Sequence, residues 1–393
     1  MLLVFSGFLN YIDRTNLSVG ATDIQRDLNL TNYDLGLLGS GFFWTYALCQ
    51  LSGLAGWVVD RFNVSWVFAT AFFMWTAATA VSGMAQVFSV FFALRLLLGI
   101  GESVAYPSYS RILANNFPEH HRGLANALID AGTKSGPALG ALLGGLMVKQ
   151  YGWRPFFLGL GFGSLLWLVP WFAWMPRGKG VAAREHHGDV PPIRAIISKR
   201  PAMFSAIGLF CTNYFWYFLI TWLPAYMEKE RHFAKERMAV FASMAFLAVA
   251  ASAVCCGWLS DRWIARGGTP TKVRKTFAGI GLTCSTIILP VAIVQDDRIA
   301  MPLLMLSCLS FGAYTANIFA ITQTLAGPRA SGKWTSFQNG FGNLAGVAAP
   351  WLTGWLVQTT HDFYLAFVVA AMMVLAGAGC FVFGIGRIQQ VEW

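Results

Sequence analysis

The residues of this sequence best suited to chemistry are two neighbouring charges, Asp13 and Arg14, inside an otherwise apolar stretch. Moving a charge to the centre of a bilayer costs roughly 3 kcal/mol on insertion scales. Charges at such depth face a bundle interior or a watery cavity, where a carboxylate can take up a proton and a guanidinium can bind an anion. Neighbours on a helix point about 100° apart. Each of the two therefore needs a partner from another helix.

A second pair of charges, Arg95 and Glu102, lies seven residues apart in another apolar stretch. Seven residues make about two helical turns, so both side chains share a face. Gly99 and Gly101 between them allow another helix to approach closely, and Pro107 favours a bend.

The four charges can be matched across helices. We expect Arg95 to pair with Asp13, and Arg14 to lie near Glu102. Static ion pairs are the alternative, but buried ion pairs add little stability compared with apolar packing. A carboxyl group buried among apolar residues, such as Glu102, suits a proton carrier.

A third pair, Asp130 and Lys134, is four residues apart and also shares a helix face. The two residues could form a local ion pair near the membrane boundary. Lys134 could instead lie in a cavity as a second anchor for an anion. The residues alone leave both possibilities open.

The second half of the chain offers neutral polar and aromatic side chains in place of buried charges. Tyr217 lies in an aromatic stretch, and Gln338 precedes Asn339 and Asn343, which share a face. Hydroxyl-rich solutes need many hydrogen-bonding side chains and flat aromatic walls, and this set supplies both. Any single Asn or Gln could equally hold two helices together.

The composition is that of an integral membrane protein. Of 393 residues, 56% are hydrophobic and only 12% are charged, against about 25% in soluble proteins. The seven cysteines are scattered without C-x-x-C spacing, and the histidines fall in loops without metal-ligand spacing. We therefore expect no metal, no cofactor other than protons, no nucleic-acid partner and no enzymatic activity.

Twelve stretches are long enough, at about 20 residues each, to cross a bilayer as helices. They lie at 1–21, 33–59, 65–84, 87–114, 122–150, 153–175, 201–227, 235–262, 273–294, 300–325, 331–358 and 362–386. A basic segment with Pro and Gly at 176–200 separates them. We predict an all-α membrane protein with an N-terminal six-helix bundle (1–175), a cytoplasmic linker (176–200) and a C-terminal six-helix bundle (201–393).

The loops predict the orientation. Those on the side of the 176–200 segment carry 17 basic and six acidic residues, against eight and nine on the other side. The positive-inside rule makes the first side cytoplasmic, with both termini. The net charge of +10 is thus mostly a topology signal.

The two halves repeat one motif. Gly56, Asp60 and Arg61 follow the second span, and Gly257, Asp261 and Arg262 follow the eighth, each in the pattern G-x-x-x-D-R. Two copies at equivalent places indicate duplication. The pattern resembles the signature of the major facilitator superfamily, where it closes the cytoplasmic side by pairing charges and helix ends.

Four further elements resemble the anion:cation symporter family of that superfamily, which includes bacterial hexuronate, galactonate and glucarate carriers, sialin and the vesicular glutamate transporters. The elements are Tyr11-Ile-Asp-Arg-Thr-Asn-Leu17, Trp44-Thr-Tyr-Ala-Leu-Cys-Gln50, Arg95-(x6)-Glu102-(x4)-Pro107 and Thr221-Trp-Leu-Pro224. The resemblance covers essentially the whole chain.

The resemblance implies a monomeric, proton-coupled importer of an organic anion, a hexuronate or aldonate, in a bacterial inner membrane. Asp13 and Glu102 would be the protonatable pair, with Arg95 as partner of Asp13. Side chains in contact with substrate would be Tyr11, Arg14, Tyr46, Lys134, Tyr217, Gln338, Asn339 and Asn343. Galactonate carriers are expected to have an uncharged polar residue where Lys134 stands, which favours a more acidic substrate. The two halves would rock about a central site in alternating access.

Several alternatives remain open. The substrate could be another carboxylate, such as an aromatic acid, a dicarboxylate or an amino-acid-like anion, and sodium could replace the proton. A neutral-sugar carrier is disfavoured by Arg14, because a buried cation attracts an anion. A channel is disfavoured because the chain carries its own two-fold duplication.

Overall fold

A computed structural model describes residues 1–30, 32–174 and 190–393. Within these ranges the chain is helical and contains no strand, as expected for backbone that must satisfy its own hydrogen bonds in lipid. Most of the predicted linker, residues 176–189, lies outside the described part of the chain.

Two compact units make up the chain, and each takes in a short segment from the other half of the sequence. Unit 1 comprises Met1–Asn115, Gly132–Ile193 and Pro328–Phe337, and unit 2 comprises Asn116–Ala131, Arg194–Gly327 and Gln338–Trp393. The division into bundles 1–175 and 201–393 stays a prediction.

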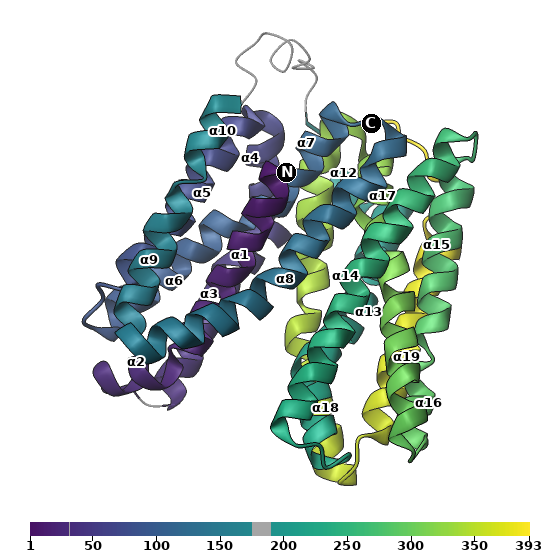
Figure 1. The fold of residues 1–393 in the computed structure, drawn as a ribbon. Coiled ribbons are helices and arrows are strands. Elements are labelled where there is room, and N and C mark those ends of the chain that lie inside the picture. The colour runs from purple at the N-terminus through teal and green to yellow at the C-terminus, as the bar shows by residue number, and fades with distance from the viewer. Residues whose placement is uncertain (31, 175–189) are drawn as a thin grey trace. The chain divides into compact units, whose positions relative to one another are not determined.

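In the first half, a helix begins close to the start of each predicted span. Several of these spans are divided into two consecutive helices (Figure 1). They are α1 (Leu2–Val19), α2 (Ala21–Asp27), α3 (Asn32–Leu51), α4 (Leu54–Arg61), α5 (Val64–Ser82), α6 (Phe88–Ser103), α7 (Ala105–Asn116), α8 (Glu119–Tyr151), α9 (Trp153–Leu165) and α10 (Leu168–Trp174).

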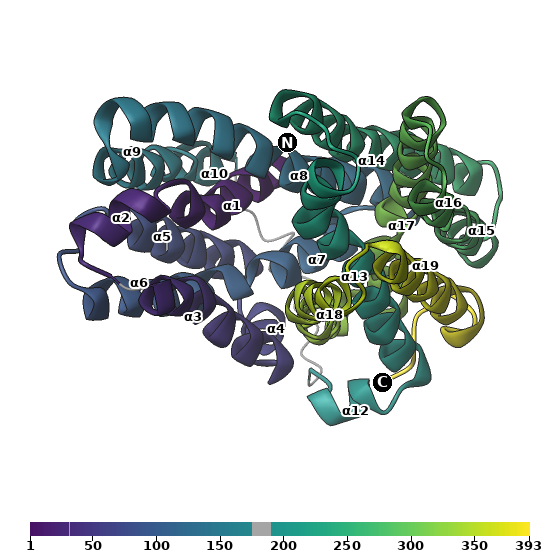
Figure 2. The ribbon, with the colours of Figure 1, turned by 90° about the horizontal axis from the view of Figure 1, so that it is seen from below.

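The second half follows the same plan. Its helices are α12 (Ile193–Ile197), α13 (Arg200–Lys229), α14 (Lys235–Ala265), α15 (Pro270–Ser285), α16 (Ile288–Ile293), α17 (Asp297–Asn343), α18 (Ala345–Thr360) and α19 (Tyr364–Gly379), followed by a π-helical turn, η1 (Cys380–Gly384). In unit 2, α13 packs against α14, α18 and α19 (Figure 2).

Among the described residues, eight helical runs are long and apolar enough to cross a membrane, or nine if the bent pair α3–α4 is one span. The run Asp297–Thr360 joins two predicted spans. The predicted spans missing from this set, 1–21 and 122–150, correspond to α1 and α8. These helices carry Asp13, Arg14 and Lys134, whose charges lower their hydropathy.

Unit 1 is built in the packing order α3, α6, α5, α9, with each helix in contact with the next (Figures 1 and 2). The predicted close approach at Gly99 and Gly101 is confirmed. A Cβ at Gly99 would run into Phe42 and Thr45 of α3, and one at Gly101 would lie 3.0 Å from the Cβ of Trp75 on α5. Glycine at position 99 is thus required for α6 to approach α3 this closely, and glycine at position 101 relieves a tight contact with α5.

The predicted fourth span breaks in the middle. α6 ends at Ser103 and α7 begins at Ala105, just before Pro107. Proline has no N–H to donate and its ring clashes with the carbonyl of the residue four positions earlier, here Ser103. The break therefore follows from Pro107 and ends the helix one residue after Glu102.

A glycine stripe on α8, formed by Gly132, Gly136 and Gly140, holds α1 at close range. Cβ atoms at these positions would lie 2.7 Å from the carbonyl oxygens of Val4 and Phe8 for the first two, and 2.8 Å from Oγ1 of Thr15 for the third. Glycines four residues apart line one helix face and let two backbones meet. The stripe fixes the position of the helix that carries Tyr11, Asp13 and Arg14.

The long helix α17 is interrupted at Gly327, which has a left-handed φ of 63°. Glycine adopts such a φ without the steric penalty that other residues pay. The interruption separates the predicted spans 300–325 and 331–358, so Pro328 starts a new helical segment.

Candidate functional site

The centre of unit 1 contains an ion pair between Arg14 of α1 and Glu102 of α6. Nε of Arg14 donates to Oε2 of Glu102 at 3.0 Å, and the two side chains are 14% and 0% exposed. The predicted proximity of these residues is confirmed. Charge-assisted hydrogen bonds of this kind are roughly twice as strong as neutral ones.

An aromatic cage surrounds the Arg14 guanidinium. Its rings are those of Tyr11, Phe42 and Tyr46, whose centroids lie 4.8, 5.1 and 5.0 Å from Cζ of Arg14. A desolvated cation over such rings gains about 2 kcal/mol or more. The structure thus brings the predicted residues Tyr11, Arg14 and Tyr46 together.

Phe42 is a member of the cage that the sequence analysis missed. Its ring stacks on that of Tyr46, with centroids 5.3 Å apart. The signal was present, since Phe42 precedes Tyr46 by four residues and shares its helix face. The close contact of Phe42 with Gly99 fixes this part of α3 against α6.

The prediction of an ion pair between Arg95 and Asp13 is wrong, because the described part of the chain contains no such pair. Arg95 is buried and donates its Nε to the backbone carbonyl of Leu38 at 3.0 Å. Asp13 is fully buried, and neither of its carboxylate oxygens has a hydrogen-bond partner in the described part of the chain. Arg95 still acts on Asp13 electrostatically. The guanidinium satisfies a carbonyl of α3, which a search limited to charges could not anticipate.

Lys134 is half-buried on α8, between Gly132 and Gly136 of the glycine stripe. The stripe packs on α1 beside Tyr11. The element that carries Lys134 is thus in contact with the helix that carries Arg14, and the role of Lys134 stays a prediction.

In unit 2, the predicted polar residues lie around the end of α17. The Tyr217 hydroxyl donates to Oδ1 of Asn343 at 2.8 Å, and Nδ2 of Asn343 donates to the carbonyl of Asn339 at 2.7 Å. Oε1 of Gln338 accepts from the Thr322 hydroxyl at 2.5 Å. The structure therefore joins Tyr217, Asn339 and Asn343, whereas Gln338 is buried against the preceding helical segment.

The first G-x-x-x-D-R motif forms an aspartate cap within unit 1. Asp60 accepts from the backbone N–H groups of Gly332 and Lys333 at 3.0 and 2.7 Å, near the start of the segment that follows Gly327. Arg111 donates to the same carboxylate at 2.9 Å. A carboxylate is favoured at a helix N-terminus, where N–H groups are unsatisfied.

The second motif forms an equivalent aspartate cap within unit 2. Asp261 accepts from the N–H groups of Gly123 and Leu124 at 3.0 and 2.7 Å, near the start of α8. Arg274, which is fully buried, donates to Asp261 at 3.0 Å and also contacts Glu119 at 3.3 Å. The expected pairing of motif aspartates with helix ends is confirmed in both copies.

The arginines that join these caps are not those of the motif. Arg61 is exposed, and Arg262 is exposed with its guanidinium over the ring of Trp258. Arg111 and Arg274 come from helices that are not equivalent in the two halves. The sequence contains no local signal for this exchange of partners.

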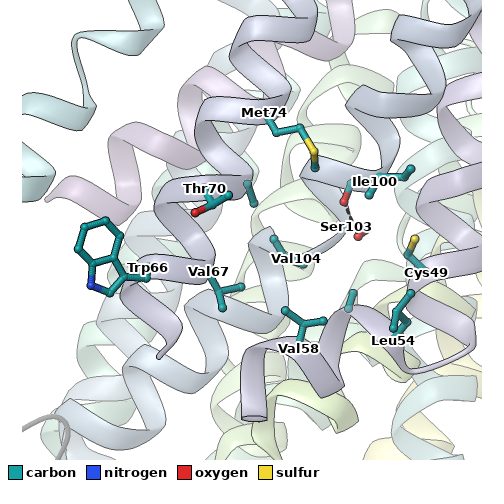
Figure 3. A pocket seen from close by; sticks show the side chains of 12 residues that line it. Cys49, Leu54, Val58, Trp66, Val67, Thr70, Met74, Ile100, Ser103 and Val104 are labelled. Atoms are coloured by element: carbon teal, nitrogen blue, oxygen red, sulfur yellow. Dashed lines mark hydrogen bonds between the residues drawn. The ribbon is translucent and has the colours of Figure 1, made fainter. Parts of the chain in front are cut away.

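Unit 1 also contains a pocket of about 410 Å³, which opens between α3, α4, α5 and α6 (Figure 3). Its lining is mostly apolar and includes Val58, Val67, Met74 and Ile100. The Ser103 hydroxyl in its wall already donates to the carbonyl of Ile100. The described residues that line this pocket include none of the predicted site residues, and its chemistry suits hydrocarbon better than an anion.

Comparisons with known proteins identify relatives over nearly the whole chain. The "Probable galactarate/D-glucarate transporter" of Bacillus subtilis is 27% identical over 99% of this chain and 92% of its own length. The "Probable sulfoacetate transporter" of Cupriavidus necator is 30% identical over 94% and 89%. The "D-galactonate transporter" of Escherichia coli is 27% identical over 97% and 93%.

Solved structures agree on the fold. The transporter FucP in its outward conformation matches with a TM-score of 0.77 at 14% identity, covering 97% of each chain. The proton:xylose symporter XylE matches with a TM-score of 0.74 at 16% identity, covering 99% of this chain and 95% of XylE. The family model of the Major Facilitator Superfamily matches residues 3–350. The chain therefore belongs to the Major Facilitator Superfamily and is a membrane transporter, not an enzyme.

Proposed function

We propose that this protein imports a sugar acid, a hexuronate or aldonate, by proton symport with alternating access. It would work as a monomer in a bacterial inner membrane with both termini in the cytoplasm. Asp13, Glu102 and Arg95 would handle the proton. The two aspartate caps would hold the cytoplasmic side closed until the transporter turns inward.

The observation that carries the proposal is the Arg14–Glu102 ion pair inside the aromatic cage. A substrate carboxylate needs the Arg14 guanidinium, which Glu102 already engages. Protonation of Glu102 would remove the competing charge and leave Arg14 to the substrate. Proton binding and anion binding would then favour each other, as symport requires.

The relatives support the substrate class, since several are named as transporters of galactarate, glucarate or galactonate. The hydrogen-bonding set of unit 2, Tyr217 with Asn339 and Asn343, offers partners for hydroxyl groups. The rings of Tyr11, Phe42 and Tyr46 offer flat walls.

A second candidate is a smaller organic anion. The relative at 30% identity is named as a probable sulfoacetate transporter. Lys134 would add a second positive charge near the helix that carries Arg14, which suits a substrate with two anionic groups.

The test is uptake of radiolabelled galactonate, glucuronate, galacturonate, glucarate and sulfoacetate into proteoliposomes, with and without an inward proton gradient. We expect at least one sugar acid to accumulate, and accumulation to collapse when the gradient is dissipated. Accumulation driven by sodium alone would overturn proton symport. Transport of sulfoacetate but of no sugar acid would select the second candidate.

A further inference from the structure

The apolar pocket of unit 1, between α3, α4, α5 and α6, is not used by the proposed transport. Its volume is about 410 Å³, and an apolar cavity of about 150 Å³ is already large enough to stay free of water and bind benzene. The Ser103 hydroxyl in its wall donates to the carbonyl of Ile100 at 2.7 Å. No described residue of the wall has a buried polar atom without a partner. The pocket therefore suits a hydrocarbon ligand larger than benzene.

Exposed apolar side chains mark the mouth of the pocket. Leu54, Trp66 and Ile100 line the pocket and are 52%, 57% and 41% exposed, whereas Ala55 and Ser103 in its inner wall are 3% and 1% exposed. Trp66 lies at one side of the pocket, with Leu54 and Ile100 at the other (Figure 3). The acyl chains of a bilayer are as apolar as leucine. An acyl chain can thus enter at this mouth and reach the inner wall while its surroundings stay apolar.

A positive charge extends the pocket face of α4. Leu54 and Val58 line the pocket, and Arg61 follows Val58 by three residues on the same face of the helix. Arg61 is exposed at the end of α4, and arginine at the end of a membrane helix reaches the level of the lipid headgroups. Guanidinium groups bind phosphate through charge-assisted hydrogen bonds. A lipid with a phosphate group therefore finds a partner for its headgroup next to a pocket for its chain.

We propose that this pocket is a phospholipid site, which takes one acyl chain inside and binds the phosphate at Arg61. The bound chain touches both sides of the 58° bend between α3 and α4, because Cys49 of α3 and Val58 of α4 line the pocket. It also touches the break after α6, where Ser103 ends the helix and Val104 follows. A ligand favours the conformation to which it binds better, so the phospholipid stabilises this bent arrangement. The proposal is independent of the transported anion and of the coupling ion.

The test locates the acyl chain by photo-crosslinking. The protein is placed in phosphatidylcholine nanodiscs that contain phosphatidylglycerol with a diazirine on one acyl chain, illuminated and analysed by peptide mass spectrometry. Val67→Phe and Val58→Phe fill the pocket from two different helices. Val81→Phe is the matched control on α5, because Val81 is 43% exposed and is not part of the pocket lining. Arg61→Ala removes the phosphate partner, with Arg262→Ala, the exposed arginine of the second motif, as its control.

We expect adducts on Cys49 and Ser103 in the unmodified protein and in both controls, because lipid outside the pocket does not reach the buried Ser103. The added phenyl ring displaces at least two methylene groups of the chain, so these adducts should fall about tenfold in Val67→Phe and Val58→Phe. They should also fall in Arg61→Ala. Adducts on Phe73, which is exposed on α5, should stay unchanged. Added phosphatidylglycerol should raise the unfolding midpoint of the unmodified protein in detergent more than that of Val67→Phe.

Adducts confined to exposed residues such as Phe73 in the unmodified protein would overturn the proposal, and this result does not depend on how well any variant folds. Unchanged labelling of Ser103 in folded Val67→Phe or Val58→Phe protein would also overturn it. Equal labelling in Arg61→Ala and Arg262→Ala would remove Arg61 from the site. A free fatty acid with the same diazirine is tested in parallel, and labelling of Ser103 by the fatty acid but not by the phospholipid would contradict the assignment to a phospholipid.

Discussion

The guanidinium of Arg14 combines a carboxylate partner with three aromatic rings, and it lies on a helix that close packing holds in place. We expect Arg14→Ala to weaken substrate binding at least tenfold, because a charge-assisted hydrogen bond contributes about 1.5–3 kcal/mol. Arg14→Lys should recover little, since an ammonium lacks the planar fork and stacks poorly on rings. Binding can be measured by scintillation proximity.

The matched control is Arg26→Ala. Arg26 also forms an ion pair on the N-terminal side of the chain, with Asp23, but its side chain is 75% exposed. Exposed ion pairs contribute about 0–1 kcal/mol. Equal binding by the Arg14→Ala and unmodified proteins would remove Arg14 from the substrate site.

Glu102→Gln should separate binding from coupling. A glutamine keeps the shape of the side chain and mimics the neutral acid, so Arg14 stays available and substrate should still exchange in counterflow. Accumulation driven by a proton gradient should be lost, because the group can no longer give up a proton. Proteoliposome uptake checks both, with the exposed Glu230→Gln as control. Normal proton-dependent accumulation in Glu102→Gln would contradict the coupling role.

The sequence predicted the proximity of Arg14 and Glu102 because both charges needed a partner from another helix. It failed for Arg95, whose guanidinium reaches the Leu38 carbonyl. Spacing shows which residues share a face, but the depth and rotation of the facing helix decide which acceptor is reached. Phe42 shares a helix face with Tyr46, which was the available signal, but its own side chain is apolar and does not show by itself that the face meets a cation.

At the scale of helices, the glycine stripe makes α1 depend on α8. Gly136→Leu would force a side chain into the Phe8 carbonyl, where even a Cβ would lie at 2.7 Å. Overpacking of this kind costs about 1–3 kcal/mol, so thermal stability in detergent should fall and uptake with it. Gly145→Leu is the control, because no described residue lies within 4 Å of a Cβ there. Similar stability of the two variants would contradict this close packing.

The aspartate caps predict which arginines matter. Arg111→Ala and Arg274→Ala should each lower stability by about 3–5 kcal/mol, because each leaves a buried aspartate without its cationic partner. Arg61→Ala and Arg262→Ala remove exposed side chains and should change little. Unfolding midpoints of the purified variants give the comparison. A larger loss for the motif arginines would show that the caps form with other partners.

Element positions were largely predictable, because apolar runs of membrane length leave the backbone no alternative to helix. The breaks within helices were less predictable. Pro107 indicated the break between α6 and α7. The interruption at Gly327 lies in a short segment between two predicted spans and depends on a left-handed backbone. The repeated motif predicted contacts with helix ends, but not which helix would supply the cationic partner.

For the whole molecule, the distribution of basic loops predicts that both termini lie in the cytoplasm. A green fluorescent protein fused after Trp393 should fluoresce, and alkaline phosphatase fused there should be inactive. Fusions placed in the loop after α13, near Arg231, should give the opposite result, with a dark fluorescent protein and an active phosphatase. Active phosphatase at the C-terminus would reverse the orientation and the direction of the proposed import.

The exchange of segments between the two units has a consequence for the order of biosynthesis. Unit 1 includes Pro328–Phe337, which the ribosome makes only after most of unit 2. Until then Asp60 is without the N–H groups of Gly332 and Lys333, and the nascent first half must persist in the membrane with Arg111 as the remaining partner of this carboxylate. Completion of unit 1 is therefore a late event in translation, and a chaperone or the insertion machinery would act on an N-terminal half that is inserted but not yet closed.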